Sequence, residues 1–231
     1  MRAKSWAYAM ALLAVGIVPS AHATTYVSGP VMEETWDTNG DPYVITGDVT
    51  IESDDDFAIV GAVVVQFQEG ERLIVEGELT AIGGATFEGY GQELGGGILV
   101  DGGVVTLTSA TIRNMDVSGN GGGINVIDGG AVTLTGCLID DCEASGKGGG
   151  IYIDGSSTVE MADACIVRDC YASGDGGGIC VSGTLKAGCD GDIQEYNEEL
   201  SLTVYGNSGY DGGGLQVEGG TVQLYKCIVR D

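Results

Sequence analysis

Short runs of alternating apolar and polar residues fill the chain from Val49 to Asp231. Alternation with a period of two is typical of β-strands that bury one face. Three such runs make one cycle, and seven cycles can be counted. One cycle is too short to bury its own apolar face, so successive cycles must stack. The pattern therefore predicts an all-β fold, a single parallel β-helix with three strands in each of about seven coils.

The alternation divides the inward apolar residues into three columns. The first run contributes Val49/Ile51, Leu73/Val75, Ile98/Val100, Ile124/Val126, Ile151/Ile153, Ile179/Val181 and Leu215/Val217. The second contributes Phe57/Ile59, Leu79/Ala81, Val105/Leu107, Val132/Leu134, Val159/Met161, Leu185/Ala187 and Val222/Leu224. The third contributes Val65/Phe67, Ala85/Phe87, Ala110/Ile112, Cys137/Ile139, Cys165/Val167, Leu202/Val204 and Cys227/Val229.

A triple-glycine phrase opens the first run of five cycles, as GGGILV, GGGINV, GGGIYI, GGGICV and GGGLQV. It lies in the corner between two coils, where a side chain would crowd the turn and a positive φ is expected. An acidic insertion, residues 189–199, lengthens the last interval between phrases. Such a loop is a common place for function, but charged runs also often just stay in solvent. A solvated loop and a cation or ligand site are both open readings of this insertion.

The ends of the chain differ from the repeats. Residues 1–23 contain two basic residues, an apolar run and an A-x-A end, which predict a secretory signal peptide too short to span a membrane. Residues 24–48 are irregular and predict an N-terminal cap, with a polar loop from Asp37 to Asp41 that could also begin a metal site. Residues 49–231 form the β-helix. The last phrase stops within a repeat, so we expect a chain truncated at its C-terminus.

Composition narrows the possible partners and chemistry. The formal net charge of −25 disfavours nucleic acid and anionic membranes as partners, because both would be repelled. The single histidine, His22, lies in the predicted signal peptide. Ser-His-Asp catalysis, Cys-His catalysis and histidine metal ligands are therefore excluded from the mature chain.

The repeats resemble those of a known group. The GGGI phrase, together with an apolar-x-x-polar phrase best preserved in Val204-Tyr-Gly-Asn207, resembles the GGAI and FxxN repeats of polymorphic outer membrane proteins. These belong to the wider right-handed β-helix class, which includes the pectate-lyase-like superfamily. Ile or Val replaces Phe here, and Met115, Cys142 and Cys170 replace Asn. The resemblance implies a right-handed β-helix at the outer cell surface.

One outward row has charges of alternating sign on successive coils: Glu88, Arg113, Asp140 and Arg168. The simpler reading is a row of surface ion pairs, each contributing about 0–1 kcal/mol, that fixes the strand register. The pectate-lyase-like resemblance implies another reading, in which Arg113 or Arg168 is a catalytic base beside calcium-binding carboxylates such as Asp140 and Asp169. An arginine base would need a strongly perturbed pKa.

A second outward row follows the first run and is acidic, with Asp101, Asp128 and Asp154 as its central members. Stacked carboxylates could bind calcium, which prefers oxygen ligands. Aspartate before glycine is also common in turns. The calcium hypothesis predicts a higher melting temperature in calcium than in chelator.

The seven cysteines follow the repeats as well. Cys137, Cys165 and Cys227 share an inward column, and Cys142 and Cys170 share a turn column, so we expect buried free thiols that act as small hydrophobic residues. Disulfides between stacked cysteines remain an alternative. Cys180 should point outward, with Cys189 as a possible partner.

These observations favour a secreted or cell-surface β-helix of structural or adhesive type without catalytic activity. Its expected partner is a polysaccharide or the surface of a host or neighbouring cell. A polysaccharide lyase or glycoside hydrolase is the alternative, because two carboxylates can suffice for glycoside hydrolysis. A repeat fold alone does not separate the two.

Overall fold

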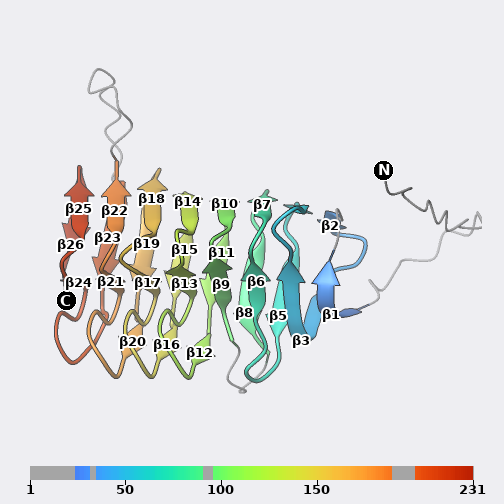
Figure 1. Ribbon diagram of the computed structural model, residues 1–231, viewed down its shortest axis with the longest axis horizontal. Coiled ribbons are helices and arrows are strands. Elements are labelled where there is room, and N and C mark those ends of the chain that lie inside the picture. Colours follow the sequence, from blue (N-terminus) through green and yellow to red (C-terminus); the bar gives the residue numbers. More distant parts are fainter. Residues whose placement is uncertain (1–23, 32–34, 91–95, 189–200, 231) are drawn as a thin grey trace, which may run out of the picture.

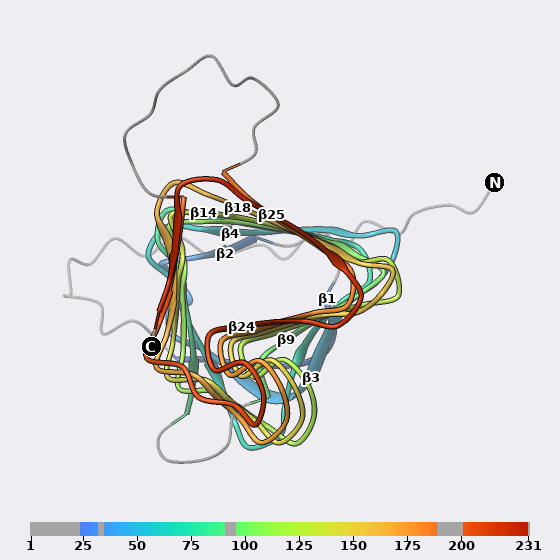
Figure 2. The ribbon, with the colours of Figure 1, turned by 90° about the vertical axis from the view of Figure 1, so that its left-hand side faces the viewer.

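The computed structural model describes residues 24–31, 35–90, 96–188 and 201–230, which form β-strands and connecting turns (Figure 1). All strand pairs are parallel, and equivalent strands of successive coils lie side by side along the long axis. Seen end-on, the coils enclose a three-sided core, and a separate lobe projects at one corner (Figure 2). The prediction of a single parallel β-helix is confirmed.

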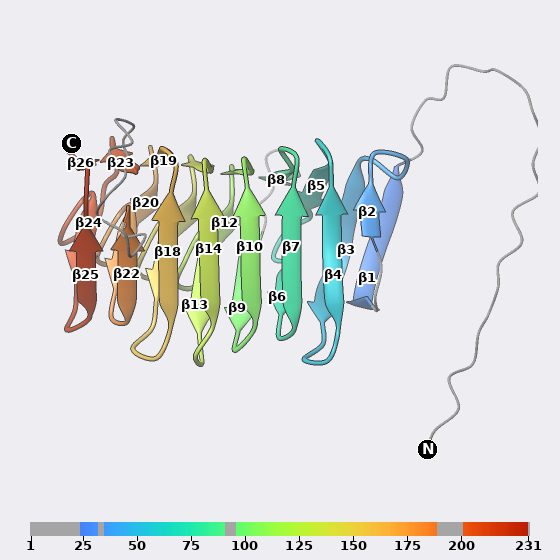
Figure 3. The same cartoon turned by 90° about the horizontal axis from the view of Figure 1, so that it is seen from above.

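We name the three sides by the order of their strands in a coil. The first face contains β3 (Tyr43–Ile51), β6 (Leu73–Val75), β9 (Ile98–Asp101), β13 (Ile124–Ile127), β17 (Ile151–Ile153), β21 (Ile179–Val181) and β24 (Leu215–Val217). The second face, an eight-stranded sheet seen from above in Figure 3, contains β2 (Thr35–Asp37), β4 (Asp56–Val60), β7 (Glu78–Ile82), β10 (Val104–Thr108), β14 (Ala131–Thr135), β18 (Thr158–Ala162), β22 (Thr184–Ala187) and β25 (Thr221–Leu224).

The third face contains β5 (Val64–Phe67), β8 (Thr86–Gly89), β11 (Thr111–Arg113), β15 (Leu138–Asp140), β19 (Cys165–Arg168), β23 (Leu202–Tyr205) and β26 (Cys227–Val229). It joins the first face through β3, which also pairs with β1 (Thr25–Val31). The projecting lobe carries a small sheet of β12 (Asp116–Val117), β16 (Glu143–Ala144) and β20 (Tyr171–Ala172).

The predicted inward columns form the core. Every inward residue predicted for the first six cycles is buried, including the aromatic Phe57, Phe67 and Phe87. In the last cycle Val217 and Val229 are each 44% exposed, because no further described coil packs against them. Burying one apolar side chain contributes about 1.5–3 kcal/mol, so each stacked coil adds substantially to the free energy of unfolding.

The register of the third face differs from the prediction at its beginning. Val65 pairs with Phe87, whereas the alternation aligned it with Ala85. Phe67 lies between Ile45 and Gly89. A shift of two residues keeps every side chain on the same face, so the apolar pattern alone cannot detect it.

The segment predicted to be irregular, residues 24–48, contains β1, β2 and the first part of β3. It adds strands before Val49 that continue the sheets. Trp36 pairs with Ile59, stacks on Tyr43 with ring centroids 4.6 Å apart, and lies edge-on to Phe57 at 5.0 Å. The polar loop is closed by its own side chains, since Asp37 accepts hydrogen bonds from the N–H and the side-chain amide of Asn39.

The sequence predicts the triple glycines at the corner between one coil and the next, and the described ones lie where the lobe returns to the first face. Gly148, the first of its triplet, has φ +67°, a conformation that glycine adopts without strain. A Cβ on Gly149, the second, would lie 2.3 Å from the carbonyl oxygen of Gly177 in the next coil. Backbone packing between coils therefore requires glycine here. Within the described residues, no helix is long and apolar enough to cross a membrane.

Candidate functional site

The lobe consists of residues 114–123, 141–150, 169–178 and 206–214, one segment from each of four coils. Neighbouring segments are held by backbone hydrogen bonds, from Gly121 N to Lys147 O at 2.9 Å and from Gly148 N to Asp175 O at 3.0 Å. Side chains add to the stack, because Asn120 Oδ1 accepts the Lys147 N–H at 2.9 Å and Lys147 forms an ion pair with Asp175 at 3.5 Å. The lobe is therefore a second, narrower stack beside the main helix.

The lobe covers the outer side of the first face. The central residues of five strands point outward there in one column, which we call the outward column: Leu99, Asn125, Tyr152, Cys180 and Gln216. The first glycines of the described triplets, such as Gly121 and Gly176, lie against it. A Cβ on Gly121 would be 2.6 Å from the Cα of Asn125, and one on Gly176 would be 2.8 Å from the Cβ of Cys180.

Cys180 shows the effect of this cover. The sequence predicts that it points outward, and its register confirms this, yet its side chain is 0% exposed. Burial raises the pKa of its thiol to about 11. Cys180 is a free thiol, and its predicted partner Cys189 lies outside the described residues. The predicted acidic insertion 189–199 also lies outside them.

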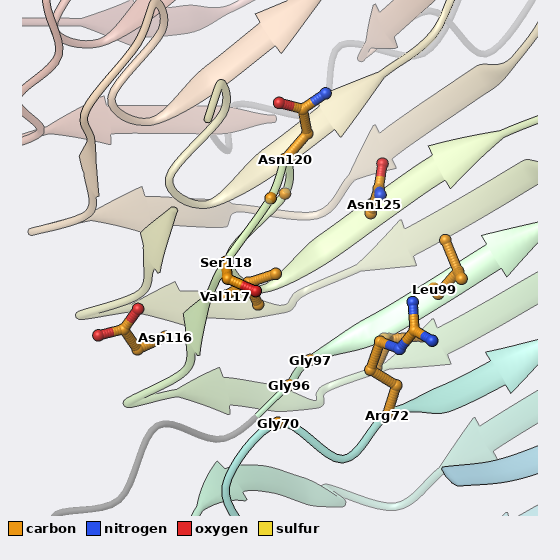
Figure 4. A pocket seen from close by; sticks show the side chains of 13 residues that line it. Gly70, Arg72, Gly96, Gly97, Leu99, Asp116, Val117, Ser118, Asn120 and Asn125 are labelled. Carbon is orange, nitrogen blue, oxygen red and sulfur yellow. The ribbon is translucent and has the colours of Figure 1, made fainter. Parts of the chain in front are cut away.

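A pocket of about 230 Å³ lies where the lobe begins, between its first segment and the first face (Figure 4). Arg72, Leu99 and Asn125 reach it from the first face. The first lobe segment contributes Asp116, Val117, Ser118 and Asn120. The pocket thus combines a guanidinium, a carboxyl, a hydroxyl and two amides with two apolar side chains.

Asn125 is the least satisfied group in this pocket. Its Oδ1 is buried and has no hydrogen-bond partner among the described residues. Buried polar atoms are nearly always hydrogen-bonded in native proteins, and leaving one unpaired costs about 1–3 kcal/mol. An unsatisfied amide at a pocket wall therefore indicates a site that a ligand completes.

The charged groups of the pocket are arranged differently. Arg72 is held by Asp48, which accepts from the Arg72 backbone N–H at 2.8 Å and from Nη2 at 3.1 Å. Burial raises the pKa of Asp116 above its ordinary value. The pocket therefore presents a cation that is already paired and a carboxyl that has lost part of its hydration.

Sequence reasoning missed Arg72, Asp116, Asn120 and Asn125. A signal was present in the sequence. The residue after each GGGI or GGGL phrase belongs to the outward column, and in that column the amide Asn125 lies between Leu99 and Tyr152. The first three lobe segments also share a Ser-Gly-x-Gly-Gly-Gly pattern, with Asn120, Lys147 and Asp175 at the variable position. What the pattern does not reveal is that this segment folds back over the first face.

The charge row on the third face forms the ion pairs of the simpler reading. Arg113 donates to Glu88 at 2.6 and 2.9 Å, and Arg168 binds Asp140 through two 2.9 Å hydrogen bonds. The Asp140 carboxylate, followed by the Tyr205 hydroxyl, raises the pKa of Arg168 above its ordinary value. This works against the predicted role of Arg168 as a base, which would have to lose its proton.

Asp169 lies at the edge of this row, with Oδ2 3.8 Å from Arg168 Nε. The structure therefore brings Arg168, Asp140 and Asp169 together. Arg113 lies between Glu88 and Asp140 in the register, and its ion pair is with Glu88. Arg113, Asp140 and Arg168 lie on strands of the third face and Asp169 directly follows β19, whereas the pocket lies on the outer side of the first face.

The three predicted calcium ligands do not form one row. Asp101 pairs with Ile127, so Asp128 lies one residue beyond the position that the alternation gave it, in a turn with φ +54°. The turn after β13 is one residue longer than the turn after β9, and this displaces Asp128. Asp154 accepts hydrogen bonds from Ser157 Oγ at 2.6 Å, Ser156 N at 3.0 Å and Asp128 N at 3.0 Å. Its carboxylate thus closes a turn.

Another acidic group has the spacing of metal ligands. Carboxylate oxygens of Glu52, Asp54 and Asp55 lie within 4.8 Å of one another in the turn after β3. The acidic run from Asp54 to Asp56 was the available signal. Clustered oxygens of this kind suit calcium, although exposed carboxylates also occur together in ordinary turns.

The cysteine columns lie as predicted. Cys137 and Cys165 occupy adjacent inward positions, and Cys142 and Cys170 share the turn column with Met115 and Asn207. These four cysteines are free and buried. Burial raises the pKa of the Cys142 thiol well above its ordinary value, as expected for a small core residue.

Residues 64–222 match the family described as a right handed beta helix region. The chain belongs to the right-handed β-helix family. The matched residues include most of the coils, the whole lobe and the pocket of this β-helix. No curated protein and no solved structure gives a significant match. Family membership establishes the architecture of this β-helix, while its function has to be argued from the site.

Proposed function

We propose that this β-helix is a secreted or surface-exposed protein of structural or adhesive type, and that it binds extracellular polysaccharide through the pocket at the start of the lobe without cleaving it. The observation that carries the proposal is the unpartnered amide of Asn125 in a pocket of mixed polar and apolar lining. Binding sites commonly combine apolar walls with a few placed polar groups.

The charge distribution supports binding rather than catalysis. Arg113 and Arg168 are engaged in ion pairs with carboxylates, and Arg72 is held by Asp48. The Asp140 carboxylate raises the pKa of Arg168, which opposes a role of Arg168 as a proton acceptor.

Extracellular location is supported by the predicted signal peptide. Expression of the full chain should yield extracellular protein that begins at Thr24, measured by mass spectrometry; retention of residues 1–23 inside the cell would contradict it.

The binding proposal can be tested with an array of extracellular polysaccharides. We expect the protein to bind at least one of them, and Asn125→Leu to remove that binding. Thr106→Ala, on the outer side of the second face, is the matched control and should bind normally. In the same samples, no new reducing ends and no unsaturated sugars should form. Absence of binding to every polysaccharide would refute the proposal.

A polysaccharide lyase or glycoside hydrolase is the second candidate, favoured by one observation. The raised pKa of Asp116 in the pocket is a property of carboxyl groups that act as general acids. Turnover that is lost in Asp116→Asn would establish this candidate. Turnover that is lost in Arg168→Lys or Asp140→Asn would instead establish the site on the third face.

A further inference from the structure

We infer that the pocket takes a neutral sugar unit and selects against uronates and other anionic sugars. This inference rests on the proposed function, because it names the class of saccharide that the same pocket binds. It is carried by the juxtaposition of Asn125, Asn120, Arg72 and Asp116 around one small cavity.

The unsatisfied groups in the pocket require both donors and acceptors. Asn125 offers an oxygen and an NH₂ group, and the oxygen is buried without a partner among the described residues. Asn120 Oδ1 accepts the Lys147 N–H of the next lobe segment, so this amide is turned toward that segment and borders the pocket (Figure 4). β12 is the edge strand of the lobe sheet, and edge strands carry unpaired N–H and C=O groups. A sugar hydroxyl both donates and accepts, so neighbouring hydroxyls satisfy such a set.

The charges around the pocket disfavour an anion. Arg72 is the cationic side chain among the lining residues, and Asp48 already offsets it. Asp116 then leaves the site with an excess of negative charge, within a chain of formal charge −25. A carboxylate on the ligand would lose hydration close to the negative charge of Asp116, which lies at the rim of the pocket (Figure 4), and this is unfavourable.

The apolar lining and the size fit one sugar ring. Leu99 and Val117 line opposite sides of the cavity and can pack against the C–H groups of a pyranose. The volume of about 230 Å³ lies below the range of roughly 300–1,000 Å³ that suits drug-sized ligands. The pocket therefore holds one unit of a chain, while the rest of the polysaccharide extends into solvent.

The test compares matched neutral and acidic oligosaccharides of equal length, such as galactose and galacturonate oligomers, by titration calorimetry of the full chain at low salt. A glucose and glucuronate series and a mannose and mannuronate series cover other hydroxyl configurations. We expect at least one neutral series to bind at least about tenfold more tightly than its acidic counterpart, and Asn125→Leu to weaken that binding by about tenfold or more. Asp116→Asn should reduce the discrimination, because it removes the repulsive charge. Thr106→Ala should change neither affinity.

The outcomes separate the two proposals. Equal or tighter binding of the uronates overturns this inference and leaves the proposed function standing. Binding of neutral oligomers that Asn125→Leu does not weaken also overturns it, since the site then lies elsewhere. No binding of any oligomer or polysaccharide overturns both. Loss of folding is not expected to obscure the result, because the Asn125→Leu substitution removes an unsatisfied buried amide.

Discussion

The outward column of the first face has two environments, a covered one at Cys180 and an open one at Leu99 and Asn125. At Cys180 the lobe segments are stacked on both sides. The Cys180 side chain is fully buried, and its free thiol serves as a small packing group. At Leu99 and Asn125 the first lobe segment leaves a pocket beside the same column. Both regions are built from the same triple-glycine phrase, so the local sequence pattern does not create the difference.

The difference comes from stacking. A lobe segment is held by its neighbours on both sides, and a covered column position faces glycines that fit closely against it. The pocket forms where this cover begins. In a solenoid each coil contacts only adjacent coils. The outward column is therefore left open where the stack of lobe segments begins, and a binding site can form there. The predictions below test whether the covered region is tight and the open region is adapted for binding.

The largest effect is expected for Gly149→Ala in the covered region. The new Cβ would lie 2.3 Å from the carbonyl oxygens of both Gly177 and Tyr171, which are backbone atoms of the next coil. Overpacking of this kind should lower the free energy of unfolding by about 3 kcal/mol, measured by urea denaturation. Gly155→Ala is the control, because a Cβ there meets nothing within 4 Å, and its effect should stay within about 0.5 kcal/mol. Equal stability of the two variants would show that the lobe packs loosely.

The second prediction compares the loss of stability when either of two asparagines of the lobe is replaced by alanine. Asn207 is 7% exposed; its Oδ1 accepts the Cys170 N–H at 2.9 Å, and its Nδ2 donates to Val167 O at 3.1 Å. Asn207→Ala leaves two buried backbone groups unpaired and should cost about 2 kcal/mol in denaturant unfolding. Asn120→Ala, at the open end, removes one hydrogen bond and should cost about 1 kcal/mol. The reverse order would contradict the assignment of the two regions.

The third effect has the opposite sign. Asn125→Leu should raise the free energy of unfolding by about 1 kcal/mol, because it replaces an unpartnered buried amide with an apolar side chain. The same substitution should remove polysaccharide binding. A protein that gains stability and loses binding at one residue would show that Asn125 is retained for function. A destabilised variant would instead indicate that the Asn125 amide has a structural partner.

The core of the fold could be predicted from the sequence because stacking repeats the same requirement in every coil. An inward residue such as Ile124 meets Ile98 and Ile151 on either side, so one apolar column specifies its neighbours. The strand register could be predicted less accurately. The two-residue shift at Val65 leaves the alternation intact, and the longer turn after β13, in which Asp128 lies, displaces one carboxylate from its row.

The pocket could not be predicted from the same pattern. It depends on how far the segment from Asp116 to Gly121 folds back over the first face, a contact between parts of the chain that alternation does not relate. Cys180 illustrates the same limit, since an outward position was correctly assigned but its cover was not foreseen. Ion pairs such as Arg168 with Asp140 were predictable, because they follow directly from register.

The smallest effect is expected from a comparison of two aspartates that occupy equivalent positions at the ends of first-face strands. Asp154 lies beside the covered region, and Asp101 lies beside the pocket. Burial alone would raise the pKa of Asp154, but hydrogen bonds from Ser157, from the Asp128 N–H and from Ser156 together lower it. A carboxyl with a lowered pKa contributes stability above its unfolded pKa of about 3.9, and loses it as pH falls through the folded pKa.

Asp154→Asn should therefore lower the free energy of unfolding by about 0.5 kcal/mol at pH 6, and the difference from the original protein should shrink below about pH 4. Urea unfolding at a series of pH values measures this. Asp101→Asn is the control, because no hydrogen bond to the Asp101 side chain is found among the described residues, and it should destabilise the protein less than Asp154→Asn does at pH 6. If Asp101→Asn were the more destabilising substitution, the Asp101 carboxylate would have to be engaged in the turn beside the pocket, and the proposed contrast between the two turns would be wrong.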